Sequence, residues 1–214
     1  MTKTRKNKKN KKNITIKNIC SRIRISSNFE SGNITYKGCN DNTINLEIRN
    51  EIYYKPVKRK YQNWFYFKVS NIKSTTVFNI NKIRNYDNDW RGFTVCYSYD
   101  NKNWKRLKNT KVNIKKKSLT WKINPKKSTI WFAYYPPYPF SKSKKLLPNM
   151  KTIGYTKERN PILMKKIGNG PKRVWIISGQ HPGETINSWM LEGFVKRLLE
   201  RKSRAVKIHF FHCS

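Results

Sequence analysis

One histidine and one carboxylate in this sequence stand at a spacing that suits metal binding. His181 and Glu184 lie three residues apart in the segment Gly179–Thr185, which reads GQHPGET. On a tight turn, this spacing lets an imidazole nitrogen and a carboxylate oxygen approach one ion, and a catalytic zinc commonly takes two His and one Glu and leaves a position for water. The alternative is a loop histidine beside a helix-capping acid, because a two-residue pattern often matches by chance.

The segments on either side of this pair predict elements that would hold it in place. Arg173–Ser178 contains a continuous apolar run, which is typical of a strand buried on both faces of an α/β sheet. Thr185 to about Lys202 has apolar residues at helical spacing, and Ala205–Phe211 follows as another strand. Strand, helix and strand predict a βαβ unit. Sites in open α/β sheets form beyond the carboxyl ends of strands, where His181 would lie.

The first part of the chain predicts an all-β sandwich over residues 23–140. Short apolar and aromatic segments recur there, separated by polar breaks and without a helical pattern. The expected strands are Thr43–Arg49, Trp64–Val69, Val77–Ile80, Phe93–Tyr99, Leu119–Ile123 and Ile130–Tyr134. Turn-forming residues at Asp100–Asn103 predict a hairpin. Three prolines within Pro136–Pro139 exclude a central strand or a helix and predict the end of the sandwich.

We therefore expect a mixed fold, an all-β sandwich followed by the opening part of an α/β domain with an incomplete sheet. The basic tail over 1–22 is expected to be disordered, because its cations repel and it has few apolar residues. A linker is expected over 141–150. The α/β domain is expected over 151–214 and would begin with the strands Thr152–Thr156 and Ile162–Ile167.

The formal net charge of +37, from 48 Lys and Arg against 11 Asp and Glu, raises the question of an acidic partner. Lys, Asn and Ile are abundant together and the cations are spread along the chain, as an AT-rich coding bias would produce. No zinc-finger, helix-turn-helix or RNP-like pattern occurs, so we expect no specific nucleic-acid binding. No apolar run is long enough for a signal peptide or a membrane span. The four cysteines form no C-x-x-C pair, and we expect free thiols in a reducing compartment.

Several motifs in this sequence resemble the cytosolic carboxypeptidases, the branch of the zinc metallocarboxypeptidases that includes tubulin deglutamylases. Trp175–Thr185, followed by Ser188–Gly193, is similar to the zinc-binding segment of that branch. Four upstream segments resemble its amino-terminal domain in the same order, namely Asn63–Val69, Phe78–Lys82, Tyr97–Asp100 with Trp104, and Ala133–Tyr138.

The resemblance implies a zinc-dependent peptidase that removes carboxy-terminal residues from proteins or peptides, with acidic, Glu-containing tails as one substrate class. It also implies a cytoplasmic location. His181 and Glu184 would be the first two ligands of one Zn²⁺ ion. The zinc would polarise the scissile carbonyl and lower the pKa of its bound water toward about 7.

The family also uses residues that the resemblance does not locate in this sequence. These are a second His ligand, an Asn-Arg pair with a further Arg for the substrate, and a late Glu as general base. His209 and His212 follow Glu184 too closely to be the later ligand. We therefore expect a truncated, frameshifted or split chain that is inactive alone, with its general base beyond Ser214. The alternative is a non-enzymatic basic sandwich module that carries a vestigial catalytic remnant and binds a partner such as a polyanion.

Overall fold

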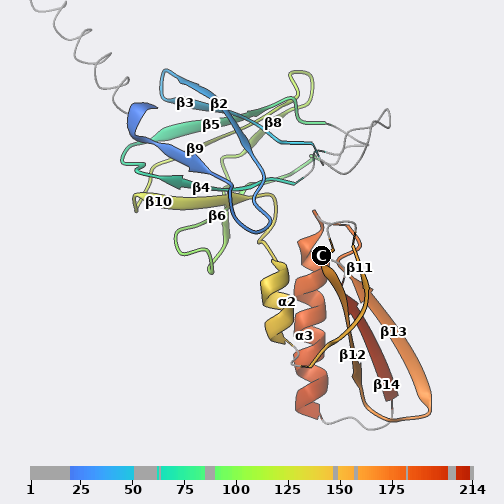
Figure 1. The fold of residues 1–214 in the computed structure, drawn as a ribbon. Coiled ribbons are helices and arrows are strands. Elements are labelled where there is room, and N and C mark those ends of the chain that lie inside the picture. The colour runs from blue at the N-terminus through green and yellow to red at the C-terminus, as the bar shows by residue number, and fades with distance from the viewer. Residues whose placement is uncertain are drawn as a thin grey trace, which may run out of the picture. The chain divides into compact units, whose positions relative to one another are not determined.

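The chain folds into two compact units, Met1–Tyr134 and Tyr135–Ser214. The computed structural model, drawn in Figure 1, describes residues 20–50, 62, 64–84, 90–146, 149–156, 159–181, 183–201 and 206–212, with the backbone alone for 201 and 206–212. Most of the expected basic tail over 1–22 lies outside the described residues.

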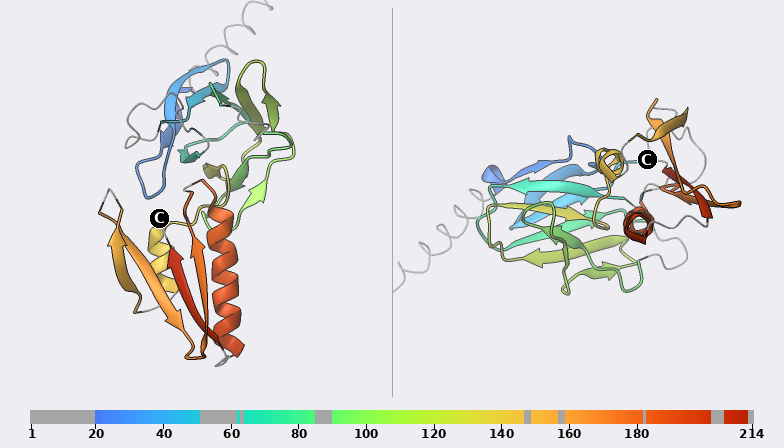
Figure 2. Two further views of the ribbon diagram at one scale, coloured as in Figure 1. Left: turned by 90° about the vertical axis from the view of Figure 1, so that its right-hand side faces the viewer. Right: turned by 90° about the horizontal axis from the view of Figure 1, so that it is seen from below.

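Unit 1 is a β-sandwich of two five-stranded sheets, as the sequence predicts (Figures 1 and 2). In order across the first sheet, the strands are β1 (Arg24–Ser26), β4 (Tyr66–Ser70), β10 (Thr129–Ala133), β6 (Cys96–Ser98) and β7 (Lys105–Arg106). The second sheet has the order β2 (Thr35–Asn40), β3 (Thr43–Glu47), β5 (Thr76–Asn81), β9 (Ser118–Ile123) and β8 (Lys111–Asn113). Strands β3 and β5 pair in parallel, whereas β2 with β3 and β5 with β9 pair antiparallel.

Aromatic side chains fill the space between the two sheets of unit 1. Phe78 of β5 stacks on Trp121 of β9 with ring centroids 5.4 Å apart, and Phe132 of β10 reaches Phe78 from the other sheet at 4.9 Å. All three rings are almost completely buried, and a buried aromatic side chain removes roughly 150–250 Å² from water. Because side chains alternate along a strand, Asn79 and Asn81 of β5 lie on the outer face of the same sheet.

The predicted hairpin at Asp100–Asn103 is present between β6 and β7. The Asp100 carboxylate accepts hydrogen bonds from the backbone N–H groups of Asn103 and Lys102, at 2.8 and 2.9 Å. Together with the Asn103 and Ser98 side chains, these bonds hold the pKa of Asp100 well below its usual range. The aspartate therefore closes the turn as the sequence predicts.

The cysteine prediction is wrong for one pair, because the structure joins Cys20 and Cys39 by a disulfide. The Cα atoms of these residues lie 5.7 Å apart, within the range that a disulfide spans, and sequence spacing gave no sign of this approach. Cys96 is a free thiol in the core, and burial raises its pKa to about 11. Cys213 lies outside the described residues.

Unit 2 contains a four-stranded sheet, with both helices on one of its faces (Figures 1 and 2). The strand order is β11 (Lys151–Tyr155), β12 (Pro161–Ile167), β14 (Val206–His212) and β13 (Lys172–Ser178). Strands β13 and β14 are parallel and are connected through helix α3 (Thr185–Arg201), which is the expected βαβ unit. Within the range expected as a linker, the chain instead forms helix α2 (Phe140–Leu146).

Helix α3 packs on the sheet through a small apolar cluster. Leu191 and Val195 are buried, and the partly buried side chains around them are Leu146, Met150, Ile167, Ile176 and Leu198. Leu146 belongs to α2 and Ile176 to β13, so the cluster joins both helices to the sheet. Burying a side chain of this kind contributes about 1.5–3 kcal/mol, and the cluster therefore accounts for the attachment of α3.

The prediction that Arg173–Ser178 is a strand buried on both faces is wrong for β13, because this strand lies at the edge of its sheet and leaves large apolar side chains exposed. Trp175 and Ile177 of β13 are 56% and 54% exposed, and Met190 of α3 is 67% exposed. Among the residues that the structure describes, β13 pairs with β14 alone. An exposed apolar edge strand is a template for association with other chains.

We predict that replacing Trp175 and Ile177 together by Thr reduces self-association of the protein. Threonine keeps a good strand propensity but removes the apolar surface. Static light scattering against protein concentration measures the effect. The matched control is Tyr36→Thr, which removes a 48% exposed side chain from the edge strand β2 of unit 1. Equal scattering by the double variant and the unaltered protein would contradict the prediction.

Candidate metal site at the start of helix α3

The turn between β13 and α3 is built around residues that the sequence analysis names. Strand β13 ends at the buried Ser178, and Gly179 follows with a φ of 79°, a left-handed conformation that glycine adopts without steric cost. The backbone N–H of Glu184 donates to the carbonyl of His181 at 3.0 Å, which closes the turn immediately before α3 begins at Thr185. Pro182 lies outside the described residues.

The turn brings the donor atoms of His181 and Glu184 close together. His181 Nδ1 lies 3.7 Å from Glu184 Oε1, and the two side chains are 72% and 57% exposed. Two ligands of a tetrahedral zinc, each about 2.1 Å from the ion, are about 3.4 Å apart. The observed separation is close to that value, and both groups are accessible from solvent. The pair therefore fits two positions of a zinc site.

The other oxygen of Glu184 is held by the first turn of the helix. Asn187 Nδ2 donates to Glu184 Oε2 at 3.3 Å, while Oε1 faces His181. The positive end of the helix dipole also favours a negative charge at this position. Sequence reasoning missed Asn187, although its place three residues after Glu184 is a spacing at which side chains meet on a helix.

Two neighbouring segments fix the start of α3. The Ser178 and Ser188 hydroxyl oxygens lie 3.4 Å apart in a buried position, which ties the end of β13 to the helix. The carbonyl oxygen of Pro136 accepts hydrogen bonds from Thr185 Oγ1 at 2.9 Å and from Trp189 Nε1 at 3.0 Å. The proline-rich segment thus binds the same helical turn that follows Glu184.

A buried ion pair joins α2 to α3 one helical turn after Ser188. Glu192 is 8% exposed, Lys142 Nζ of α2 lies 3.1 Å from its Oε2, and Lys196 Nζ lies 2.7 Å from its Oε1. Lys142 also sits 4.3 Å from the ring centroid of Trp189, a cation–π distance. Burial opposes ionisation of Glu192, but hydrogen bonds from Lys196 and Lys142 lower its pKa overall. Burial and the Glu192 charge raise the pKa of Tyr138.

The described side chains supply two donors to this site and not a third. Among the residues that the structure describes, no group of three or more His, Cys, Asp or Glu side chains comes together. The backbone register of β14 places His209 opposite Trp175 and His212 opposite Ser178, and the structure describes no side chain for either histidine.

Comparison with known proteins agrees with the fold. The family model of the cytosolic carboxypeptidase N-terminal domain matches residues 25–135. An uncharacterised protein of Zymomonas mobilis is 26% identical over 198 residues, which cover 87% of this chain and 50% of the relative. Cytosolic carboxypeptidase 3 of Mus musculus is 25% identical over 223 residues, which cover 85% of this chain and 22% of the relative.

A solved structure extends the likeness beyond the sandwich. The crystal structure of a metallo-carboxypeptidase from Burkholderia cenocepacia matches with a TM-score of 0.74 and 26% identity, over 88% of this chain and 55% of that one. The chain thus spans about half of the first relative and of this structure, and less than a quarter of the mouse protein.

The fold and the matches define the class of this protein as a metallocarboxypeptidase-type chain. More narrowly, the chain belongs to the family of the cytosolic carboxypeptidase N-terminal domain, because that family model covers more than half of its residues. The resemblance stated from the motifs is confirmed. Within the described part of the chain, no helix is both long and apolar enough to cross a membrane.

We predict that Gly179→Ala and Gly193→Ala change stability in opposite directions. At Gly179, with its φ of 79°, a Cβ costs about 1–2 kcal/mol of unfolding free energy. At Gly193 inside α3, a Cβ meets nothing within 4 Å, so alanine stabilises the helix by about 0.5–1 kcal/mol. Urea unfolding followed by circular dichroism measures both changes. If both variants were destabilised, the loss of stability in Gly179→Ala could not be attributed to the left-handed conformation of the turn.

We predict that Glu192→Gln destabilises the protein at neutral pH by about 1–2 kcal/mol, because it leaves Lys142 and Lys196 without their carboxylate. The pKa of Glu192 is lowered on folding, so its contribution is complete above its ordinary value of 4.5 and is lost as the pH falls further. The difference in unfolding free energy between the variant and the parent should therefore become smaller in acid. Thermal unfolding against pH measures it, and Glu200→Gln, at the exposed pair with Arg197, should have little effect.

Proposed function

We propose that this chain provides two zinc ligands, His181 and Glu184, to a metallocarboxypeptidase that removes carboxy-terminal residues from proteins or peptides in the cytoplasm. The observation that carries the proposal is the 3.7 Å approach of His181 Nδ1 to Glu184 Oε1 at the carboxyl end of β13. Sites of α/β sheets form at such strand ends. Family membership supports the proposal, since the metallo-carboxypeptidase from Burkholderia cenocepacia has this fold.

In this proposal, residues of this chain would bind the zinc ion and orient its ligands. His181 would donate the lone pair of a neutral imidazole nitrogen, and Glu184 would donate a carboxylate oxygen that Asn187 holds in place. When bound, the zinc would polarise the scissile carbonyl and lower the pKa of a water toward about 7. Thr185 and Trp189 donate hydrogen bonds to the Pro136 carbonyl, which would hold the first turn of α3, directly after Glu184, in place.

We propose further that the chain alone does not turn over substrate. Zinc sites ordinarily use at least three protein donors, whereas the described side chains supply two. A general base typically contributes about 10²–10⁴-fold in rate, and we propose that this group lies outside the chain. The third ligand and the base would come from residues that correspond to the other half of the relatives. Substrates would include acidic, Glu-containing carboxyl-terminal tails.

We predict that the chain binds Co²⁺ or Zn²⁺ weakly and that His181→Ala and Glu184→Gln each weaken this binding about tenfold or more, since each removes one of two donors. Isothermal titration with Zn²⁺ and the visible absorption of added Co²⁺ measure the affinity without any enzyme assay. The matched control is Glu200→Gln, which removes an exposed carboxylate of the same helix outside the pair.

Two results would contradict the proposal. Equal metal affinity of the three variants and the parent would show that His181 and Glu184 do not bind the ion. Release of glutamate from a Glu-terminated peptide by the zinc-loaded chain would overturn the expected inactivity and leave the ligand assignment in place.

A further inference from the structure

Unit 1 contains a pocket that is not part of the candidate metal site. It has a volume of about 780 Å³ and lies where strands β3 and β5 end. Pockets of roughly 300–1,000 Å³ are the usual size for sites that take small ligands or short peptide segments. Its walls include Glu47, Ile48, Lys82, Ile83 and Lys117.

The topology of the second sheet creates this pocket. Strands β3 and β5 are parallel, and Glu47 pairs with Asn81. The carboxyl ends of both strands therefore lie side by side. The turn between β8 and β9 closes one side, because the backbone N–H of Ile83 donates to the carbonyl of Lys117 at 2.9 Å. Residues distant in sequence therefore line one hollow.

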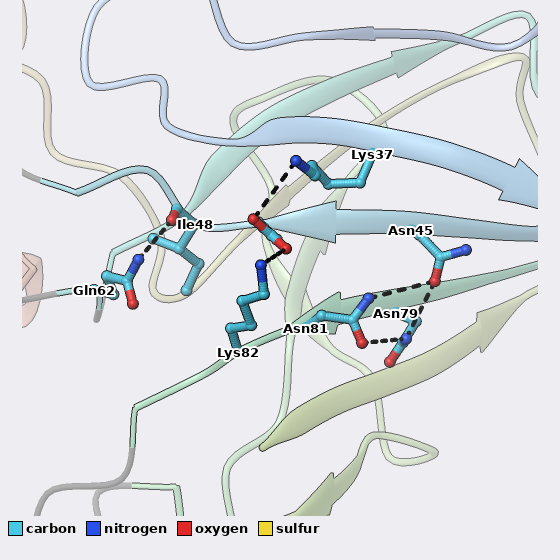
Figure 3. Close-up of polar contacts among 8 residues, drawn as sticks. Lys37, Asn45, Ile48, Gln62, Asn79, Asn81 and Lys82 are labelled. Atoms are coloured by element: carbon cyan, nitrogen blue, oxygen red, sulfur yellow. Dashed lines mark hydrogen bonds and ion pairs between the residues drawn. The ribbon is translucent and has the colours of Figure 1, made fainter. Parts of the chain in front are cut away.

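The charges around the pocket are mostly positive. The described lining of the pocket contains one carboxylate, that of Glu47, which is already paired with Lys82 at 2.7 Å and with Lys37 at 3.9 Å. Figure 3 shows Lys37 and Lys82 and marks both ion pairs with dashed lines. Arg84 and Lys117 add two more cations to the lining. Lys117 is also the last of three consecutive lysines in the β8–β9 turn. The local excess of cations favours a ligand that carries several negative charges.

The pocket also carries amide groups in fixed positions. Gln62 Nε2 donates to the carbonyl of Ile48 at 3.0 Å. Asn81 belongs to a ladder on the outer face of the sheet, in which Asn79 Nδ2 donates to Asn81 Oδ1 at 2.9 Å and to Asn45 Oδ1 at 3.3 Å (Figure 3). Preoriented amides and apolar walls suit an extended peptide, whose backbone offers donors and acceptors along its length.

We propose that this pocket binds an acidic peptide segment, with Lys82 and Lys117 pairing with its carboxylates. The amide groups and the isoleucine side chains of the lining favour a peptide as the anionic ligand, and single-stranded DNA is the competing ligand in the test. The pocket belongs to unit 1 and the metal pair to unit 2, so peptide binding goes beyond the proposed function and does not depend on it.

The test is fluorescence anisotropy of a labelled oligoglutamate peptide with the full chain. We expect saturable binding that weakens with salt, and a loss of about tenfold in affinity in the double variant Lys82→Gln and Lys117→Gln. The matched control is Lys126→Gln with Lys127→Gln, which removes the same charge from exposed positions between β9 and β10. Circular dichroism verifies that both double variants are folded.

The outcomes separate the alternatives. If both double variants weakened peptide binding equally, the pocket would not be the binding site, because only the net charge of the protein would then matter. Binding of single-stranded DNA that is tighter than that of oligoglutamate, and equally sensitive to the Lys82 and Lys117 changes, would overturn the peptide assignment. His181→Ala should bind the peptide as the parent does, so a failure of the metal site cannot be mistaken for a failure of the pocket.

Discussion

The carbonyl oxygen of Pro136 holds the part of the molecule on which the candidate metal site depends. Proline has no N–H and cannot take a place inside a helix or a central strand, so the segment that contains it stays extended and its carbonyl remains available to other groups. Thr185 and Trp189 both donate to this oxygen. Together with the buried contact between Ser178 and Ser188, these hydrogen bonds restrict the first turn of α3. Glu184 precedes that turn directly, and its carboxylate is therefore placed by the helix.

Burial of a charged group strengthens the same arrangement. Glu192 lies one helical turn beyond Ser188 and keeps its charge because Lys142 and Lys196 bind it from two elements. Removing one partner of a buried carboxylate is costly, because it leaves an uncompensated charge in the interior. The apolar cluster around Leu191 and Val195 and this ion pair thus both attach α3 to α2.

Much of this fold follows from local pattern. The β5 and β9 strands alternate buried and polar residues so regularly that their inner faces can be read directly, and the Asp100 turn follows from its residue types. The short strands β1, β7 and β8 were not predicted, because two or three paired residues leave no periodic pattern. The six-residue strand β2 was also missed, because its residues do not alternate between buried and exposed. Helix α2 was missed because its sequence, FSKSKKL, is polar and follows prolines. The approach of His181 to Glu184 was foreseen from spacing, but Asn187 and Pro136 act through contacts that spacing does not reveal.

The free thiol of Cys96 has a practical consequence. Its side chain is 1% exposed between the sheets, and burial raises its pKa to about 11, so at neutral pH it is both shielded and protonated. The thiolate is the nucleophile that attacks an alkylating reagent, and the sulfur becomes reactive only when the sandwich opens. The rate of alkylation at this position, followed by peptide mapping, thus reports the opening of unit 1 by itself, whatever happens around helix α3.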